Sequence, residues 1–272
     1  MLTYKMLKQI TLTLLLIFCI SGCNNKEDVS TLNNGEVLIV ESSEKNVKAP
    51  VDVATEYQKL DIEGWSVMIS PEVQNDSELY QPIVAQLTKD LKKVKGVVPE
   101  AILLKLQKTV IWSEKSMPVK QLNTLFFNGS RKLTKKYNLK AESYGGVILG
   151  KTKAYLAVAG FKPWGMLHEL THAYHQFFIK HNFAPIVQAY ENIKKTNLHN
   201  PKFDKRVKGS GYPTKNKKEY FSELTVAYFA KKLFYPHTRS ELAEYDPIGY
   251  CAVVSAWGLK GKQQGDIPLL CN

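Results

Sequence analysis

The chain has 272 residues, and a typical domain size of about 150 residues leads us to expect one or two domains. With 44% hydrophobic and 23% charged residues, the composition excludes a long disordered chain, a collagen-like fibre and a disulfide-dense miniprotein. Lys and Arg number 37 against 25 Asp and Glu, a formal net charge of +12. That excess allows an anionic partner, whether nucleic acid, an acidic membrane surface or an acidic protein, without choosing among them.

The N-terminus has the pattern of an export signal. Lys5 and Lys8 precede an 11-residue apolar run, Ile10 to Ile20 (ITLTLLLIFCI). A transmembrane helix needs about 20 apolar residues, whereas a secretory signal needs only about 7–15. We therefore expect this segment to be a cleaved signal peptide.

The residues that end the signal, Ile20-Ser21-Gly22-Cys23, resemble the lipobox of bacterial lipoproteins. The resemblance implies cleavage before Cys23, so that residues 1–22 are removed and the Cys23 thiol is acylated. Two or more acyl chains would anchor the protein firmly. Asn24 resembles the residue that follows this cysteine in lipoproteins sorted to the outer membrane, so we expect a protein there that faces the periplasm or the cell surface. A plain signal peptide with an accidental ISGC is the alternative.

Export also bears on the remaining cysteines. Cys19 leaves with the signal and Cys23 takes the lipid, which leaves Cys251 and Cys271. In an oxidising compartment these two can form a disulfide, and two buried free thiols are the alternative.

The first half of the chain predicts a small mixed sheet with helices. Residues 23–60 are polar and read as a flexible tether with one short strand near Val37 to Val40, so the folded domain is expected over 61–272. Alternation of apolar residues predicts a half-buried strand at 65–69. A helical stripe from Leu79 to Val94, a regular helix starting near Pro82 and a short helix after Pro99 follow. Further strands are predicted in 109–113, 124–128 and 145–150.

The second half is mainly helical. Helices are predicted over residues 164–180, 183–196, 216–232 and about 246–257. The expected fold class is therefore α+β, with a small mixed sheet, an active-site helix and a mainly helical C-terminal half.

A metal-binding motif lies in the first of these helices. His168 and His172 are four residues apart, so on a helix they project from one face and can share a single Zn²⁺. Glu169 stands beside them, where it can take a proton from a water molecule that the metal has acidified. The composition gives a chance expectation of about 0.01 for such a match. Two core histidines with a solvated glutamate are the alternative.

The third protein ligand must come from elsewhere. A metzincin needs a histidine at position 178, where this chain has Phe178, so that class is excluded. His175 faces roughly the same way as His172, and we expect it to pack or to support a ligand rather than to bind metal. A gluzincin takes a glutamate from a later helix, and Glu219 and Glu223 share one helical face. Like charges so spaced repel each other, which a cation between or beside them would relieve.

The combination resembles the anthrax-lethal-factor-like branch of gluzincins, which includes secreted Pro-Pro endopeptidases. The matching residues are HExxH, then Tyr212 and Glu219-Tyr220-Phe221-Ser222-Glu223, with Glu219 47 residues after His172. Uncharacterised bacterial and fungal metallopeptidases share GWSVMISPE, WGMLHELTHAYH, KKEYFSELTVAYF and FYPHTRSELAEYDP, over nearly all of residues 60–258. The resemblance implies a zincin-like fold, Glu219 as third zinc ligand, Tyr212 as stabiliser of the oxyanion and Glu223 as the residue that orients a ligand histidine. The lysine-rich stretch from Lys215 to Lys218 departs from the pattern and leaves the choice of substrate open.

Two function classes follow from these motifs. The first is a membrane-tethered zinc metallopeptidase acting on a peptide or protein substrate, which we expect to be a monomer. The second is a non-catalytic surface lipoprotein that keeps a zincin fold as a binding module. The presence of Glu169 and Tyr212 with all three ligands favours the enzyme, because a binding module has no use for a general base.

Substrate contacts can be predicted in outline. An extended substrate usually pairs with an edge strand beside the active-site helix, and Gly145 to Gly150 is the candidate for that edge, with an interior strand as the alternative. Between Lys194 and Lys218 there are nine basic residues and one acidic residue. This segment is either a solvated loop or a surface that steers acidic substrates or meets an anionic membrane. No nucleic-acid motif accompanies the charge, so we expect no nucleic-acid partner.

Overall fold

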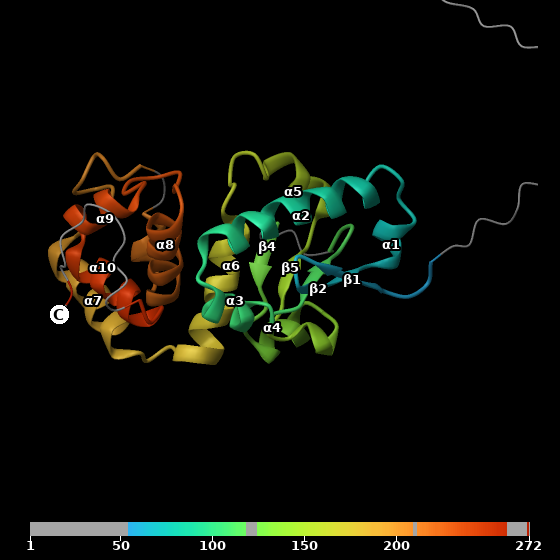
Figure 1. Cartoon of the computed structure of the whole chain (residues 1–272), viewed down its shortest axis with the longest axis horizontal. Helices are drawn as coiled ribbons and strands as arrows, with labels where there is room; N and C mark the ends of the chain where they lie inside the picture. The colour runs from blue at the N-terminus through green and yellow to red at the C-terminus, as the bar shows by residue number, and fades with distance from the viewer. Residues whose placement is uncertain (1–53, 118–123, 209–210, 260–270, 272) are drawn as a thin grey trace, which may run out of the picture. The chain divides into compact units, whose positions relative to one another are not determined.

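The computed structural model describes residues 54–117, 124–208, 211–259 and 271. They form an α+β fold in which a five-stranded mixed sheet is followed by a helical C-terminal half, as the sequence predicts (Figure 1). The signal peptide, Cys23 and the tether up to residue 53 lie outside the described residues and stay predictions. Within the described ranges, none of the helices combines the length and the apolar character that crossing a membrane requires.

The sheet has the strand order β1-β2-β3-β5-β4. Its strands are β1 (Gln58–Ile62), β2 (Trp65–Ile69), β3 (Ile111–Ser113), β4 (Leu125–Phe127) and β5 (Val147–Leu149). β1 and β2 form an antiparallel pair, β2, β3 and β5 run parallel, and β4 is antiparallel to β5. β1 begins three residues before the expected start of the folded domain, because pairing with β2 orders a segment whose own sequence is polar.

The strand predicted at 145–150 is confirmed as β5, but its expected place at the edge is wrong, and the alternative of an interior strand is correct. β5 lies between β3 and β4 and bonds to both, so neither side of this strand is open. The edge beside the site is β4, which packs against helix α6 (Gly165–Tyr174). Pairing partners lie far apart in the sequence, so the buried, apolar character of β5 could not reveal its neighbours.

The two faces of the sheet follow the alternation of side chains along each strand. Trp65, Val67 and Ile69 of β2 are fully buried in the main core, which confirms the predicted half-buried strand. The opposite face carries a smaller cluster that contains Trp112, Met117, Phe126 and Ile148.

Helices of the first half cover the sheet and lead to α6. They are α1 (Pro71–Gln74), α2 (Tyr80–Val97), α3 (Glu100–Leu106), α4 (Arg131–Lys136), the 3₁₀ turn η1 (Ala141–Ser143) and α5 (Thr152–Val158). The helical stripe predicted for α2 is confirmed, since Ile83, Leu87, Leu91 and Val94 are buried. Pro82 lies in the first turn of α2, where its missing N–H has no helical partner to lose.

The helical half follows α6. A π-helical turn η2 (His175–Ile179) continues α6, and then come α7 (Ala184–Thr196), the 3₁₀ turn η3 (Tyr212–Thr214), α8 (Lys217–Phe229), α9 (Arg239–Tyr245) and α10 (Pro247–Ala256). α6 contacts both β4 and α8, so it connects the sheet to the helical half (yellow in Figure 1). Cys251 in α10 and Cys271 form a disulfide, which decides between the two states that the sequence allowed.

Candidate metal centre

The site starts from two histidines on one face of α6. His168 and His172 lie one helical turn apart, and their ring centroids are 4.8 Å from each other. The opposite side of the helix is buried in the core through Leu167, Leu170 and Ala173. The amphipathic pattern of α6 therefore fixes the direction of both imidazoles.

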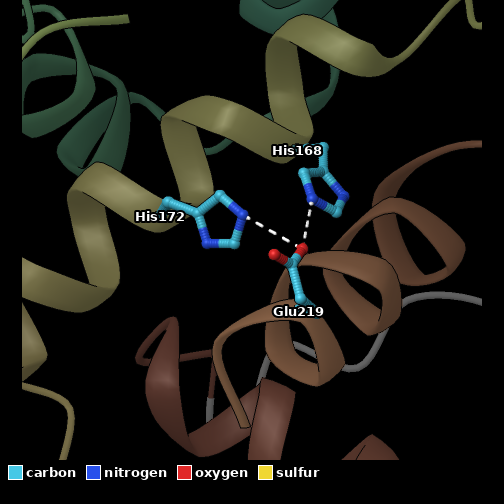
Figure 2. Close-up of side chains that lie close together, drawn as sticks. All are labelled: His168, His172 and Glu219. Carbon is cyan, nitrogen blue, oxygen red and sulfur yellow. Dashed lines mark hydrogen bonds and ion pairs between the residues drawn. The ribbon is translucent and has the colours of Figure 1, made fainter. Parts of the chain in front are cut away.

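Glu219 on α8 completes a three-residue group. Its Oε2 lies 3.0 Å from His168 Nε2 and 3.3 Å from His172 Nε2 (Figure 2). Each of the three residues offers one potential ligand atom, and these three atoms lie within 4.8 Å of one another, so the group could hold a metal ion. The spacing of His168 and His172 predicts two members of this triad and the resemblance to gluzincins implies the third, and the structure brings all three together.

The N-terminal cap of α8 fixes the position of Glu219. Asn216 caps this helix, and its Oδ1 accepts the backbone N–H groups of Lys218 and Glu219 at 3.0 and 3.1 Å. The Asn216 cap was not singled out in the sequence, although Asn directly before a helix is a common start signal.

The far nitrogen of each histidine also has a partner. His168 Nδ1 lies 3.2 Å from Glu223 Oε1, and His172 Nδ1 lies 3.1 Å from Ser222 Oγ. These contacts hold both rings with Nε2 toward Glu219, the arrangement that a metal site needs. Glu223 had been predicted beside a ligand histidine. Ser222 had not, although its position three residues after Glu219 places it on the same face of α8.

A buried lysine joins this arrangement from beyond the end of α8. Lys232 is 6% exposed, and its Nζ lies 3.1 Å from Glu223 Oε2. Nothing in the sequence distinguished it from the 36 other basic residues. Burial of a lysine is rare unless it is paired, so the contact with Glu223 accounts for its position.

Charge coupling shifts the pKa values of these groups. Burial lowers the pKa of His168, but its hydrogen bonds to Glu219 and Glu223 outweigh burial and raise it to about 10. Burial raises the pKa of Glu223, but His168 and Lys232 outweigh it and hold that pKa at about 2. The pKa of Glu219 is lowered in the same way by His168 and His172. The carboxylates are therefore ionised at neutral pH.

Glu169 lies beside the triad and is held by the sheet. Its Oε2 accepts the backbone N–H of Phe127, on the edge strand β4, at 2.9 Å, and lies 4.0 Å from His172 Nε2. Burial raises the pKa of this carboxyl group, while the two histidines oppose the shift. The carboxylate is thus fixed between β4 and the potential ligands, as its predicted role requires.

Tyr212, the first residue of η3, lies next to His168. Its ring centroid lies 6.0 Å from that of His168, and burial and the site carboxylates raise the pKa of its phenol, so the hydroxyl keeps its proton. The turn before it depends on Gly211, which has a φ of +60°, and a Cβ there would lie 2.6 Å from Pro201 Cδ.

His175 lies outside the metal group. It is fully buried, and its ring packs edge-on against His181 and Phe221, with centroids 4.9 and 5.0 Å away. Neither ring nitrogen has a hydrogen-bond partner among the described residues. Burial lowers the pKa of His175 to about 3, so the ring is neutral and serves packing.

A buried polar cluster holds α8 against the helices that follow it. Asp246 Oδ2 accepts the Tyr220 hydroxyl at 2.6 Å and lies 2.9 Å from His199 Nε2. The His199 backbone N–H donates to the Tyr245 hydroxyl at 2.8 Å. Tyr220 directly follows Glu219, so these bonds tie the metal-facing turn of α8 to α9 and α10.

Neither a protein-family model, nor a curated protein, nor a solved structure matches the chain.

Proposed function

We propose that the protein is a zinc-dependent metallopeptidase of the gluzincin type, tethered to the outer membrane through a lipidated Cys23. The observation that carries this proposal is the convergence of His168, His172 and Glu219 with Glu169 directly beside them. Two imidazole nitrogens and one carboxylate oxygen are a ligand set of catalytic zinc sites, which leave one position open.

The donor atoms fit a zinc ion. Both Nε2 atoms turn toward one oxygen of Glu219, and both Nδ1 atoms contact Glu223 or Ser222, so a metal ion that displaced the proton of His168 would find both Nε2 lone pairs directed at it. A zinc ion held there would supply a Lewis acid that lowers the pKa of a water molecule and polarises a peptide carbonyl.

The chain's own groups then handle the protons and the charge. Glu169 accepts the proton of the attacking water on its carboxylate and later passes it to the leaving amine. The Phe127 N–H holds one oxygen of this carboxylate, which keeps the group in place. The Tyr212 hydroxyl, which keeps its proton, donates to the oxygen on which negative charge develops. The edge strand β4 offers backbone groups along which an extended peptide could align.

Activity and metal content test the proposal together. Purified wild-type protein should contain about one zinc per chain and cleave a denatured protein mixture, whereas Glu169→Gln should keep the zinc and lose turnover. Glu191→Gln, which removes an exposed carboxylate on α7, is the matched control and should behave as wild type. A zinc-loaded wild type that cleaves nothing would favour the binding module, and full activity in Glu169→Gln would contradict the mechanism.

The membrane anchor has its own test. Cys23→Ser should abolish incorporation of labelled fatty acid and release the protein from the membrane fraction, because no acyl chain can then form on residue 23. Unchanged membrane partitioning of this variant would mean that another segment holds the protein.

A further inference from the structure

The net positive charge of the chain is concentrated in the segment that builds the site. Residues 124–218 contain 18 Lys and Arg against 4 Asp and Glu, a net charge of +14, whereas the other residues contain 19 against 21, a net charge of −2. The segment includes β4, α6, Tyr212 and the first residues of α8. The positive charge is therefore carried by the same stretch of sequence that contributes β4, α6 and Tyr212 to the site.

Three lysines lie in or just before the first turn of α8. The Nζ of the exposed Lys215 lies 5.0 Å from the centroid of the Tyr212 ring. Lys217 and Lys218 immediately precede Glu219, and their charges contribute to the lowered pKa values of His175 and His181. One cation thus contacts the oxyanion donor, and two more directly precede the third ligand in the sequence.

Aromatic residues lead from His172 to another cation on the β4 side. The Phe127 ring stacks on His172 with a centroid distance of 6.4 Å, and Phe177 lies 6.1 Å from both Phe127 and Tyr144. Phe177 is 38% exposed. The guanidinium of Arg131 lies 4.7 Å from the Tyr144 centroid. A partly exposed aromatic strip therefore ends at a positive charge.

The interior of the site does not neutralise these cations. Glu169, Glu219 and Glu223 carry three negative charges when ionised, Lys232 carries one positive charge, and a divalent ion would bring the sum to zero. The lysines and the arginine around the site are left to act on whatever enters it.

We infer that the substrate of this site is an acidic peptide segment, with Asp or Glu residues within a few positions of the scissile bond. The inference rests on the proposed function. An acidic peptide is favoured over an anionic membrane because Lys215 contacts Tyr212 itself and because the aromatic strip that ends at Arg131 starts from the ligand His172.

Peptide binding to Glu169→Gln tests the inference without turnover. Two labelled peptides of equal length and aromatic content, one rich in Asp and Glu and the other in Lys, are titrated by fluorescence anisotropy. We expect the acidic peptide to bind at least tenfold more tightly in 50 mM salt, and the difference to shrink in 0.5 M salt as screening increases. Lys215→Glu and Lys218→Glu should each weaken acidic-peptide binding by about threefold to tenfold.

The control is Lys59→Glu, an equal charge change on β1 at the opposite edge of the sheet, and it should leave peptide binding unchanged. Equal affinity for the two peptides, or an equal loss in Lys59→Glu, overturns the inference. A third outcome would also overturn the inference: Cys23→Ser protein binds anionic vesicles, Lys215→Glu abolishes that binding, and the protein does not discriminate between the two peptides. Acidic preference in binding without cleavage of either peptide by the wild type would instead refute the proposed peptidase.

Lys232 supports a second inference on independent grounds. Its backbone is clamped, because its N–H donates to the His237 carbonyl at 2.8 Å and its carbonyl accepts from His237 Nδ1 at 3.1 Å. Its buried ammonium contacts one oxygen of Glu223, whose other oxygen contacts His168 Nδ1. A continuous chain of contacts thus runs from Lys232 to a metal ligand.

We propose that Lys232 is a positioning residue that acts on His168 through Glu223. A carboxylate buried without a counter-charge would turn toward solvent, and this movement would free the His168 ring to rotate. This proposal also rests on a metal at the site, but it does not require peptidase activity.

Zinc affinity tests the positioning role. Lys232→Met should weaken zinc binding by about 10-fold to 100-fold, as loss of a partner that orients a ligand does, and Lys232→Arg should restore part of it. Lys231→Met is the matched control, because Lys231 is exposed, and it should bind zinc normally.

A double variant separates positioning from general damage to the fold. If Lys232 acts only through Glu223, then Glu223→Gln with Lys232→Met should lose no more zinc affinity than Glu223→Gln alone. Additive losses, or zinc binding by Lys232→Met within threefold of wild type, would overturn the proposal.

Discussion

His175 gives the protein a built-in sensitivity to mild acid. Its ring is fully buried without a hydrogen-bond partner among the described residues, and its pKa is about 3 in the fold. In the unfolded chain the pKa returns to about 6.5. Below pH 6.5 the unfolded state therefore binds a proton that the folded state does not bind, so the free energy of unfolding falls as the pH falls.

The size of this effect follows from linkage. At pH 5 the solution is about 1.5 pH units below the pKa of the unfolded imidazole, and at 1.36 kcal/mol per unit His175 by itself lowers the free energy of unfolding by about 2 kcal/mol relative to neutral pH. Glu219 and Glu223 do not contribute in this window, because their pKa values are lowered in the fold and their stabilisation is lost only below about pH 4.5. A loss of about 2 kcal/mol lowers Tm by about 4–8 °C for a domain of this size.

His175→Leu removes the titrating group while keeping an apolar side chain of similar size. Metal-free wild type and variant are unfolded by heat and by urea at pH 8, 7, 6 and 5. The difference between the two free energies of unfolding at pH 8 measures the cost of replacing His175 by Leu. Between pH 7 and pH 5 the free energy of unfolding of the variant should fall by about 2 kcal/mol less than that of the wild type. An identical pH slope in the two proteins would show that His175 is protonated in the fold and would refute the reasoning. The variant should still bind zinc, because His175 lies outside the metal group.

The other predictions concern the site and the disulfide. Tyr212→Phe should lower kcat by about 100-fold with little change in KM, because the hydroxyl acts mainly in the transition state, and a pure rise in KM would reassign Tyr212 to substrate binding. Glu219→Ala should empty the zinc site, whereas Glu223→Ala should cost only about 10–100-fold in zinc affinity; titration showing the reverse order would exchange their roles. Cys251→Ser should destabilise the fold by about 3 kcal/mol under non-reducing conditions, since the disulfide closes a loop with a sequence separation of 20, and equal urea midpoints with and without the bond would contradict this.

The sequence by itself determined the local features of this protein. The apolar stripe of α2, the alternation of β2 and the shared face of His168 and His172 depend only on residues a few positions apart, because helical and strand periods are properties of contiguous chain. The resemblance to gluzincins implied Glu219 and Glu223, and the structure brings Glu219 to both histidines and Glu223 to His168. α9 escaped prediction because seven residues are too few for a periodic signal to emerge.

Only the tertiary structure decided which distant residues meet. β5 and β4 are both short apolar strands, and the pairing that puts β5 inside and β4 at the edge joins segments about 20 residues apart. Lys232 looks in the sequence like any other surface lysine, and its burial against Glu223 results from how the chain turns back after α8. Its contact with Glu223 crosses the turn that follows α8, and local periodicity carries no information on such contacts, so the residues that support the predicted ligands emerge only from the packed fold.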